Sequence, residues 1–193
     1  MGFASVLSFA HQLVASNVRP GEPVIDATAG RGNDTLFLAK HVGPRGTVYA
    51  FDIQQDALDQ TDNRLRRNSI DVSSGCVRLH LCSHHLMNDV IEPRDCGKIG
   101  AAMFNLGYLP EGDQRLITTS TTTIVALQAT LGLLRSGGVV TIVLYPGHQD
   151  GDVEAADVER WATQLDKVLY QSLIYRFLNG ATQAPYLISL IKR

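Results

Sequence analysis

An aspartate followed closely by two glycines is the pattern in this chain with the clearest chemical meaning. Asp26 lies in an apolar stretch, Pro23 to Ala27, and Gly30 and Gly32 follow just before an apolar helical pattern. Glycine lets a chain turn tightly and lie flat against a ligand, and the next helix points unpaired N–H groups at that ligand. A carboxylate facing this loop repels a pyrophosphate and attracts an ammonium or a sulfonium. The pattern therefore predicts a ligand with positive charge near the glycines.

A second aspartate indicates what the other end of the ligand is. Asp52 ends the next apolar run, 47–52, and an acid about 20 residues past the glycines can accept both hydrogen bonds of a ribose diol. A dinucleotide-binding fingerprint would need a third glycine, but Thr35 takes that place. A ribose at one end and a cationic amino acid at the other describe S-adenosylmethionine. NAD and a degenerate site are the alternatives.

Two later loops carry side chains suited to chemistry on an amine. In the run Asn105-Leu106-Gly107-Tyr108, the Asn side-chain oxygen and the next carbonyl would accept hydrogen bonds from the amine, while the aromatic ring packs on the substrate base. A simple Asn turn after a strand is the alternative. In the other loop, His148 titrates near neutrality and could take a proton from an ammonium, and Tyr145 could hydrogen-bond or stack. An exposed loop histidine without a role is the alternative reading.

The loop Cys82-Ser83-His84-His85 is expected beside the same pocket. Ser83 or His84 would contact an adenine there, or Ser83 would only cap the short helix that follows. Glu154 and Asp157 lie near the start of a later predicted helix, and we expect them to be solvated residues that offset its dipole.

Alternating strand and helix patterns are expected to position these loops. The pattern predicts strands at 23–27, 47–52, 76–81, 99–104, 139–145, 168–177 and 184–191, and helices at 1–16, 33–42, 54–68, 83–90, 120–135 and 152–165. Repeated strand–helix units predict an α/β, doubly wound, mostly parallel seven-stranded sheet with the ligand at its carboxyl edge. The last two strands lack an intervening helix and predict an antiparallel closing hairpin. This is the Rossmann-like plan of class I methyltransferases.

Composition narrows the class of protein. The 193 residues fit a single domain, 1–193, with its first helix packed on it, and 45% hydrophobic residues suffice for one core. No apolar stretch is long enough to span a membrane. Three cysteines without paired spacing predict reduced thiols in a cytoplasmic protein without a metal site. A net charge of −2 excludes a strongly basic nucleic-acid binder, but not an RNA enzyme with a local basic patch.

Several motifs, spread in sequence order over nearly the whole chain, resemble those of one family. They are Asp26-Ala-Thr-Ala-Gly30-x-Gly32-x-Asp34-Thr35, Phe51-Asp52-Ile53-Gln54, Ser83-His84, Phe104-Asn105-Leu106-Gly107-Tyr108-Leu109-Pro110, the threonines of 119–123 and Tyr145-x-Gly147-His148-x-x-Gly151. The chain resembles the small bacterial methyltransferases once named rRNA methylases and now associated with tRNA wobble uridine, in which 5-aminomethyl-2-thiouridine becomes its methylaminomethyl form. Arg31 departs from the Asn expected between the two glycines.

The resemblance implies a role for each candidate residue. Asn33 and Asp34 would bind the methionine ammonium, Asp52 and Gln54 the ribose, and Tyr108, with Tyr145, would stack on a flipped-out base. The expected cofactor-binding residues are Asp26, Thr28, Gly30, Gly32, Asn33, Asp34, Thr35, Asp52, Gln54, Ser83, His84 and Asn105, and the expected catalytic residues are Asn105, Tyr108, Tyr145 and His148.

The implied partner is the anticodon region of tRNA. RNA binding has only a weak signal in the sequence, namely three arginines within 64–67 and Arg115 after the Asn105 loop. A small domain with little basic surface would enlarge its footprint as a homodimer. Methylation of a small amine metabolite or of rRNA is the alternative activity, and a noncatalytic cofactor-binding protein is a further alternative.

Overall fold

Seven strands form one sheet in this computed structural model, which describes residues 2–107, 118–147 and 151–193. The strands are β1 (Pro23–Asp26), β2 (Thr47–Asp52), β3 (Val77–Leu81), β4 (Ile99–Asn105), β5 (Leu134–Leu144), β6 (Tyr170–Tyr175) and β7 (Tyr186–Lys192). Their order is β3-β2-β1-β4-β5-β7-β6, and β7 runs antiparallel to the other six strands. The predicted fold class is confirmed, including the closing hairpin of β6 and β7.

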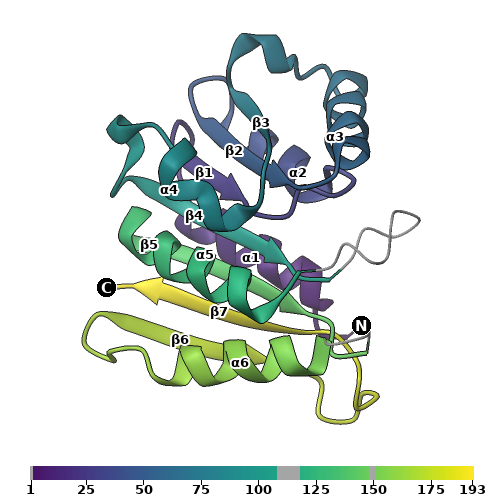
Figure 1. Ribbon diagram of the computed structural model, residues 1–193, viewed down its shortest axis with the longest axis vertical. Coiled ribbons are helices and arrows are strands. Elements are labelled where there is room, and N and C mark those ends of the chain that lie inside the picture. The colour runs from purple at the N-terminus through teal and green to yellow at the C-terminus, as the bar shows by residue number, and fades with distance from the viewer. Residues whose placement is uncertain (1, 108–117, 148–150) are drawn as a thin grey trace.

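Helices cover both faces of the sheet (Figure 1). One face carries α1 (Val6–Asn17), α2 (Asn33–Val42) and α3 (Gln55–Arg67). The other carries α4 (Met87–Val90), α5 (Ser120–Leu133) and α6 (Gly151–Thr163). Short 3-10 turns lie elsewhere along the chain, at Val72–Ser74, His84–Leu86 and Pro93–Asp95. Each face has its own core: Ala10, Leu38 and Leu65 lie in one, and Leu127 and Val158 in the other. Within the described ranges, no helix is both long and apolar enough to cross a membrane.

The helix expected at 1–16 is α1, which begins only at Val6. Ser5 is the N-cap of this helix, because the Ser5 hydroxyl oxygen accepts a hydrogen bond from the Ser8 N–H at 3.2 Å. The first helical turn lies near the carboxyl edge of the parallel strands, where Leu7 contributes to the pocket described below.

Strand β5 starts earlier than its apolar run predicts, because it contains a bulge. Ile99 pairs with Leu134 and Ala101 pairs with Val139, so the residues between Leu134 and Val139 leave the regular ladder. Gly137 permits this with a φ of 71°.

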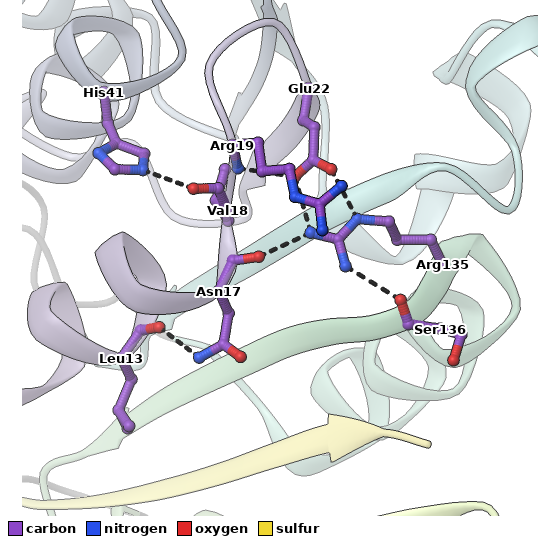
Figure 2. Close-up of polar contacts among 8 residues, drawn as sticks. All are labelled: Leu13, Asn17, Val18, Arg19, Glu22, His41, Arg135 and Ser136. Atoms are coloured by element: carbon purple, nitrogen blue, oxygen red, sulfur yellow. Dashed lines mark hydrogen bonds and ion pairs between the residues drawn. The ribbon is translucent and has the colours of Figure 1, made fainter.

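The bulge directs Arg135 into a polar cluster at the amino edge of the sheet (Figure 2). The Arg135 guanidinium donates two hydrogen bonds of 2.8 Å to the Glu22 carboxylate and one of 2.6 Å to the Asn17 carbonyl oxygen. The Asn17 amide in turn donates to the Leu13 carbonyl oxygen at 2.8 Å. These contacts connect the end of α1 to the turn before β1 and to β5, so α1 is fixed to the sheet at the end opposite Leu7.

Candidate functional site

A pocket of about 740 Å³ lies at the carboxyl ends of the parallel strands. Its lining comes from the residues that follow β1, β2, β3, β4 and β5, together with α1 and the start of α5. The strand order changes direction between β1 and β4, and ligands bind at such switch points in open parallel sheets. Ten predicted site residues line this pocket: Thr28, Gly30, Asn33, Asp34, Asp52, Gln54, Ser83, His84, Asn105 and Tyr145.

Asp26 lies beneath the glycine loop and does not line the pocket. Its carboxyl group is fully buried and accepts hydrogen bonds from the Thr28 N–H at 3.1 Å and from the Thr35 hydroxyl at 2.5 Å. Burial, together with the charge of Asp34, raises the pKa of Asp26 to about 7. The expectation that the Asp26 carboxylate faces the ligand is therefore corrected. Asp26 and Thr35 hold the loop from below.

The second glycine of the loop serves helix packing rather than the pocket lining. Gly32 has a φ of 74°, and a Cβ there would lie 2.8 Å from the Cα of Thr61 on α3. Thr61 is fully buried, and its hydroxyl donates to the Gly30 carbonyl oxygen at 3.2 Å. The close approach of α3 fixes the loop whose other glycine, Gly30, faces the pocket.

Asp52 holds two loops in the lining of the pocket. Its carboxylate accepts hydrogen bonds of 2.9 Å from the N–H groups of Gly30 and Gln54. Burial raises the pKa of Asp52, while these two backbone donors oppose the shift. The same residue thus shapes the glycine loop and lines the pocket.

Asp34, on the first turn of α2, is the acidic residue that lines the pocket near the glycines. Its side chain is 9% exposed, and one of its oxygens lies 2.7 Å from Nε2 of His11 on α1. The His11 ring stacks on Phe37, with 4.0 Å between centroids and 3° between planes. The carboxylate at the N-terminus of α2 is therefore held in one orientation by α1.

His84, another residue of the pocket lining, has a buried nitrogen without a hydrogen-bond partner among the described residues. Its Nδ1 lies 3.1 Å from the Ala27 carbonyl oxygen, which can only accept, so Nδ1 carries the proton of the neutral ring. Burial lowers the pKa of His84 to about 4, so the ring is neutral near pH 7. Its Nε2 is buried and has no partner among the described residues. Ser83 contacts His85 through a 2.8 Å hydrogen bond and makes no side-chain cap to the following turn.

Asn105 and Tyr145 meet in the pocket lining. Their side chains share a hydrogen bond, and burial and the charge of Asp34 raise the pKa of Tyr145. Tyr145 is therefore a neutral phenol at pH 7 and is not suited to act as a base. The Asn105 N–H donates to the Thr28 hydroxyl oxygen at 2.8 Å, so the loop after β4 is joined to the loop after β1.

The other two predicted catalytic residues, Tyr108 and His148, lie outside the described residues, as does Arg115. Several pocket residues escaped the sequence prediction: Leu7, Thr118, Thr122 and Gln183. The threonines are adjacent to or within the threonine run of 119–123, which was the one available signal. Leu7 and Gln183 reach the pocket through the packing of α1 and of the β6–β7 connection, and no local pattern marks them.

Glu154 contradicts its predicted role as a solvated residue. It is 3% exposed and accepts 2.7 Å hydrogen bonds from the hydroxyls of Thr118 and Thr123. Both donors lie more than 30 positions earlier in the chain, so the helix pattern around Glu154 carries no trace of them.

The polar groups of the pocket fit S-adenosylmethionine. The unsatisfied Nε2 of His84 is an acceptor suited to an adenine amino group, Asp52 to a ribose diol, and Asp34 to an ammonium. Two acidic side chains in the lining would disfavour the pyrophosphate of a dinucleotide.

Comparisons with known proteins agree with this ligand. The family described as "Putative rRNA methylase" matches residues 48–191, and the ubiE/COQ5 methyltransferase family matches residues 8–81. A chloroplastic tRNA (mnm(5)s(2)U34)-methyltransferase from Arabidopsis thaliana is 36% identical over 189 residues, which cover 95% of this chain and 68% of that protein.

Two solved structures are similar over their full length. The crystal structure of a putative rRNA methylase from Clostridium thermocellum has a TM-score of 0.93 and 35% identity, with 100% of both chains covered. A putative methyltransferase from Streptococcus mutans, solved in complex with SAH, has a TM-score of 0.87 and 31% identity at the same coverage. SAH is what remains of S-adenosylmethionine after its methyl group is transferred. The chain is a member of the family described as "Putative rRNA methylase" and is an S-adenosylmethionine-dependent methyltransferase.

Proposed function

We propose that this enzyme methylates the aminomethyl group of 5-aminomethyl-2-thiouridine at the wobble position of tRNA. The observation that carries the proposal is the placement of Asn105 in the lining of the cofactor pocket, where its backbone N–H donates to Thr28 and its side-chain amide is hydrogen-bonded to Tyr145. The 36% identity to the chloroplastic tRNA methyltransferase supports the same acceptor. Bound S-adenosylmethionine supplies an electrophilic methyl group on a sulfonium.

The chain's own residues would bind and orient the reactants. Asp34 and Asn33 would bind the methionine ammonium, with His11 holding the Asp34 carboxylate, and Asp52 and Gln54 would bind the ribose. Ser83 and the free Nε2 of His84 would take the adenine. The Asn105 side-chain oxygen would accept a hydrogen bond from the substrate amine and align its lone pair, and such alignment supplies much of the acceleration in a group transfer.

A transfer assay with three acceptors in parallel separates the proposed activity from its alternatives. Purified enzyme and methyl-labelled cofactor would be incubated with tRNA from a strain lacking this methylation, with ribosomal subunits, or with a mixture of small primary amines. We expect label in tRNA. Label only in ribosomal RNA or only in the small amines would contradict the proposal.

A variant tests whether the pocket is catalytic and not only a binding site. Asn105→Ala should lose most methyl transfer while S-adenosylhomocysteine still binds. Transfer at the wild-type rate by this variant would remove Asn105 from the catalytic role.

We also propose that the active form is a homodimer paired through the edge strand β6. This strand has no charged residue from Tyr170 to Tyr175, and Leu173 and Ile174 are 43% and 50% exposed on opposite faces of it. An uncharged edge strand readily pairs with a second copy of itself. Light scattering after size exclusion should give twice the chain mass of 21.0 kDa, and Ile174→Lys should give a monomer. A wild-type monomer at micromolar concentration would contradict this.

A further inference from the structure

We propose that Glu154 is a positioning residue for the loop that carries Asn105, acting through Thr118 and Gly107. The inference rests on the proposed role of Asn105 in orienting the acceptor amine. Glu154 itself does not line the pocket; it lies on α6, after the loop that follows β5, whereas Asn105 ends β4.

The first step is the buried carboxylate. Glu154 is 3% exposed, and its two oxygens accept hydrogen bonds of 2.7 Å from Thr118 and Thr123. A carboxylate buried in this way is costly unless donors satisfy it, and hydrogen bonds to a charged acceptor are roughly twice as strong as neutral ones. The two threonines are therefore held firmly, each with its only hydroxyl proton committed to Glu154.

The second step is the connection from Thr118 to Gly107. Because the Thr118 hydroxyl donates its proton to Glu154, its oxygen lone pairs remain available as acceptors. The Gly107 N–H donates to this oxygen at 2.9 Å, and the Thr118 N–H donates to the Gly107 carbonyl oxygen at 3.1 Å. Gly107 has a φ of 145°, a conformation that favours glycine. Two reciprocal bonds thus fix Gly107, with Glu154 setting the direction of one of them.

The third step is the effect on Asn105, two residues before Gly107. The Asn105 N–H is held by Thr28, and the next N–H, of Leu106, donates to the Val143 carbonyl oxygen at 3.0 Å. Gly107 is thus the third residue in a row whose backbone N–H is hydrogen-bonded. Its acceptor, the Thr118 hydroxyl oxygen, is in turn held by Glu154 on α6. Release of that support lets the Leu106–Gly107 backbone move, and with it the carbonyl group after Asn105, which would accept a hydrogen bond from the acceptor amine.

The test uses two variants that break the connection and two matched controls. Glu154→Gln removes the charge at the same volume, and Thr118→Val removes both the donor to Glu154 and the acceptor for Gly107. Thr123→Val removes the other hydrogen bond to Glu154 without touching Gly107. Asp157 is also on α6, and its carboxylate is hydrogen-bonded to the side chain of Ser120 on α5. Asp157→Asn therefore controls for the packing of α5 against α6.

The first readout needs no substrate. Exchange of the Gly107 amide hydrogen, followed by NMR on glycine-labelled protein, should accelerate about tenfold in Glu154→Gln and Thr118→Val, since each loses about one buried hydrogen bond. Both controls should stay within about twofold of the wild type. Unchanged Gly107 exchange in folded Glu154→Gln, or equal acceleration in Thr123→Val, would overturn the proposal.

The second readout is the rate of methyl transfer to the tRNA acceptor. We expect kcat to fall about tenfold or more in the two test variants, because small misplacements of reacting groups are costly, while the Kd for S-adenosylhomocysteine stays unchanged. Equal losses of kcat in test and control variants would assign Glu154 a structural role only. If tRNA is not the acceptor, the wild type itself fails this assay while the exchange readout still decides the role of Glu154.

Discussion

At the scale of single residues, two aspartates that look equivalent in sequence have different positions relative to the pocket. Asp26 is buried beneath the loop with a pKa of about 7, whereas Asp34 lines the pocket beside His11. Asp26 was expected to face the ligand and does not line the pocket, whereas Asp34, expected to bind the methionine ammonium, does line it. Strand alternation shows that a residue is buried; it does not show whether its carboxyl group points up into a pocket or down onto Thr35.

Replacement of Asp26 tests this assignment through the pH dependence of stability. The Asp26 carboxyl group has a pKa of about 7 in the folded protein, against an ordinary aspartate value of 3.8. It therefore contributes fully to stability below pH 3.8, and that contribution is lost as the pH rises through 7. Asp26→Asn lacks this titration. Compared with the variant, the wild type should therefore lose stability between pH 4 and 7, by up to about 1.4 kcal/mol per unit of pKa difference.

Urea unfolding of both proteins at several pH values measures that difference. A difference that is independent of pH between 4 and 7 would show that the Asp26 carboxyl group is not held in its neutral form.

Asp52 carries the second prediction at this scale. Asp52→Ala removes the proposed ribose acceptor and the acceptor for the Gly30 and Gln54 N–H groups, so the Kd for S-adenosylhomocysteine should rise about 10- to 100-fold. Calorimetric titration measures the change. Asp56→Ala, which removes an exposed acid four positions later, is the matched control, and a similar loss in both variants would exclude a specific role.

At the scale of elements, the glycine loop depends on how closely α3 approaches α2. Gly32, before α2, and Gly75, after the turn Val72–Ser74, both have left-handed backbones with φ values of 74° and 80°, but only a Cβ on Gly32 would collide with Thr61. The two glycines therefore separate the cost of backbone conformation from the cost of a steric clash.

Alanine at each position gives the comparison. Gly75→Ala should cost about 1–2 kcal/mol of unfolding free energy from its left-handed backbone, and Gly32→Ala should cost clearly more and also weaken S-adenosylhomocysteine binding. Urea unfolding and calorimetry measure both effects. Equal costs in the two variants would mean that the contact with Thr61 does not constrain the loop.

Most element limits followed from local sequence, and the exceptions have long-range causes. The helix 33–42 and the strand 47–52 were predicted at their observed limits, because glycines flank α2 and a turn precedes β2. The start of β5 was missed because its bulge is stabilised by the Arg135–Glu22 pair, 113 positions apart. The buried state of Glu154 was missed for the same reason, since Thr118 and Thr123 on and before α5 create it.

At the scale of the whole molecule, the two edges of the sheet have different tasks. The amino edge carries the Arg135–Glu22 cluster that fixes α1 (Figure 2), and the carboxyl edge carries the pocket, to which α1 contributes Leu7. The fold and the cofactor class could be predicted from sequence because they depend on repeated strand–helix units and a local loop. The acceptor came only from the family resemblance, since the site that would recognise it is built from loops of distant segments that meet only in the folded chain.

The most direct test of the central claim is where the transferred methyl group is found. The enzyme would be incubated with S-adenosylmethionine and tRNA from a strain lacking this methylation, and the nucleosides analysed by mass spectrometry. We predict that 5-aminomethyl-2-thiouridine gains the mass of one methyl group and is consumed as its methylaminomethyl form appears. Unchanged 5-aminomethyl-2-thiouridine, or a methyl group on any other nucleoside, would contradict the account.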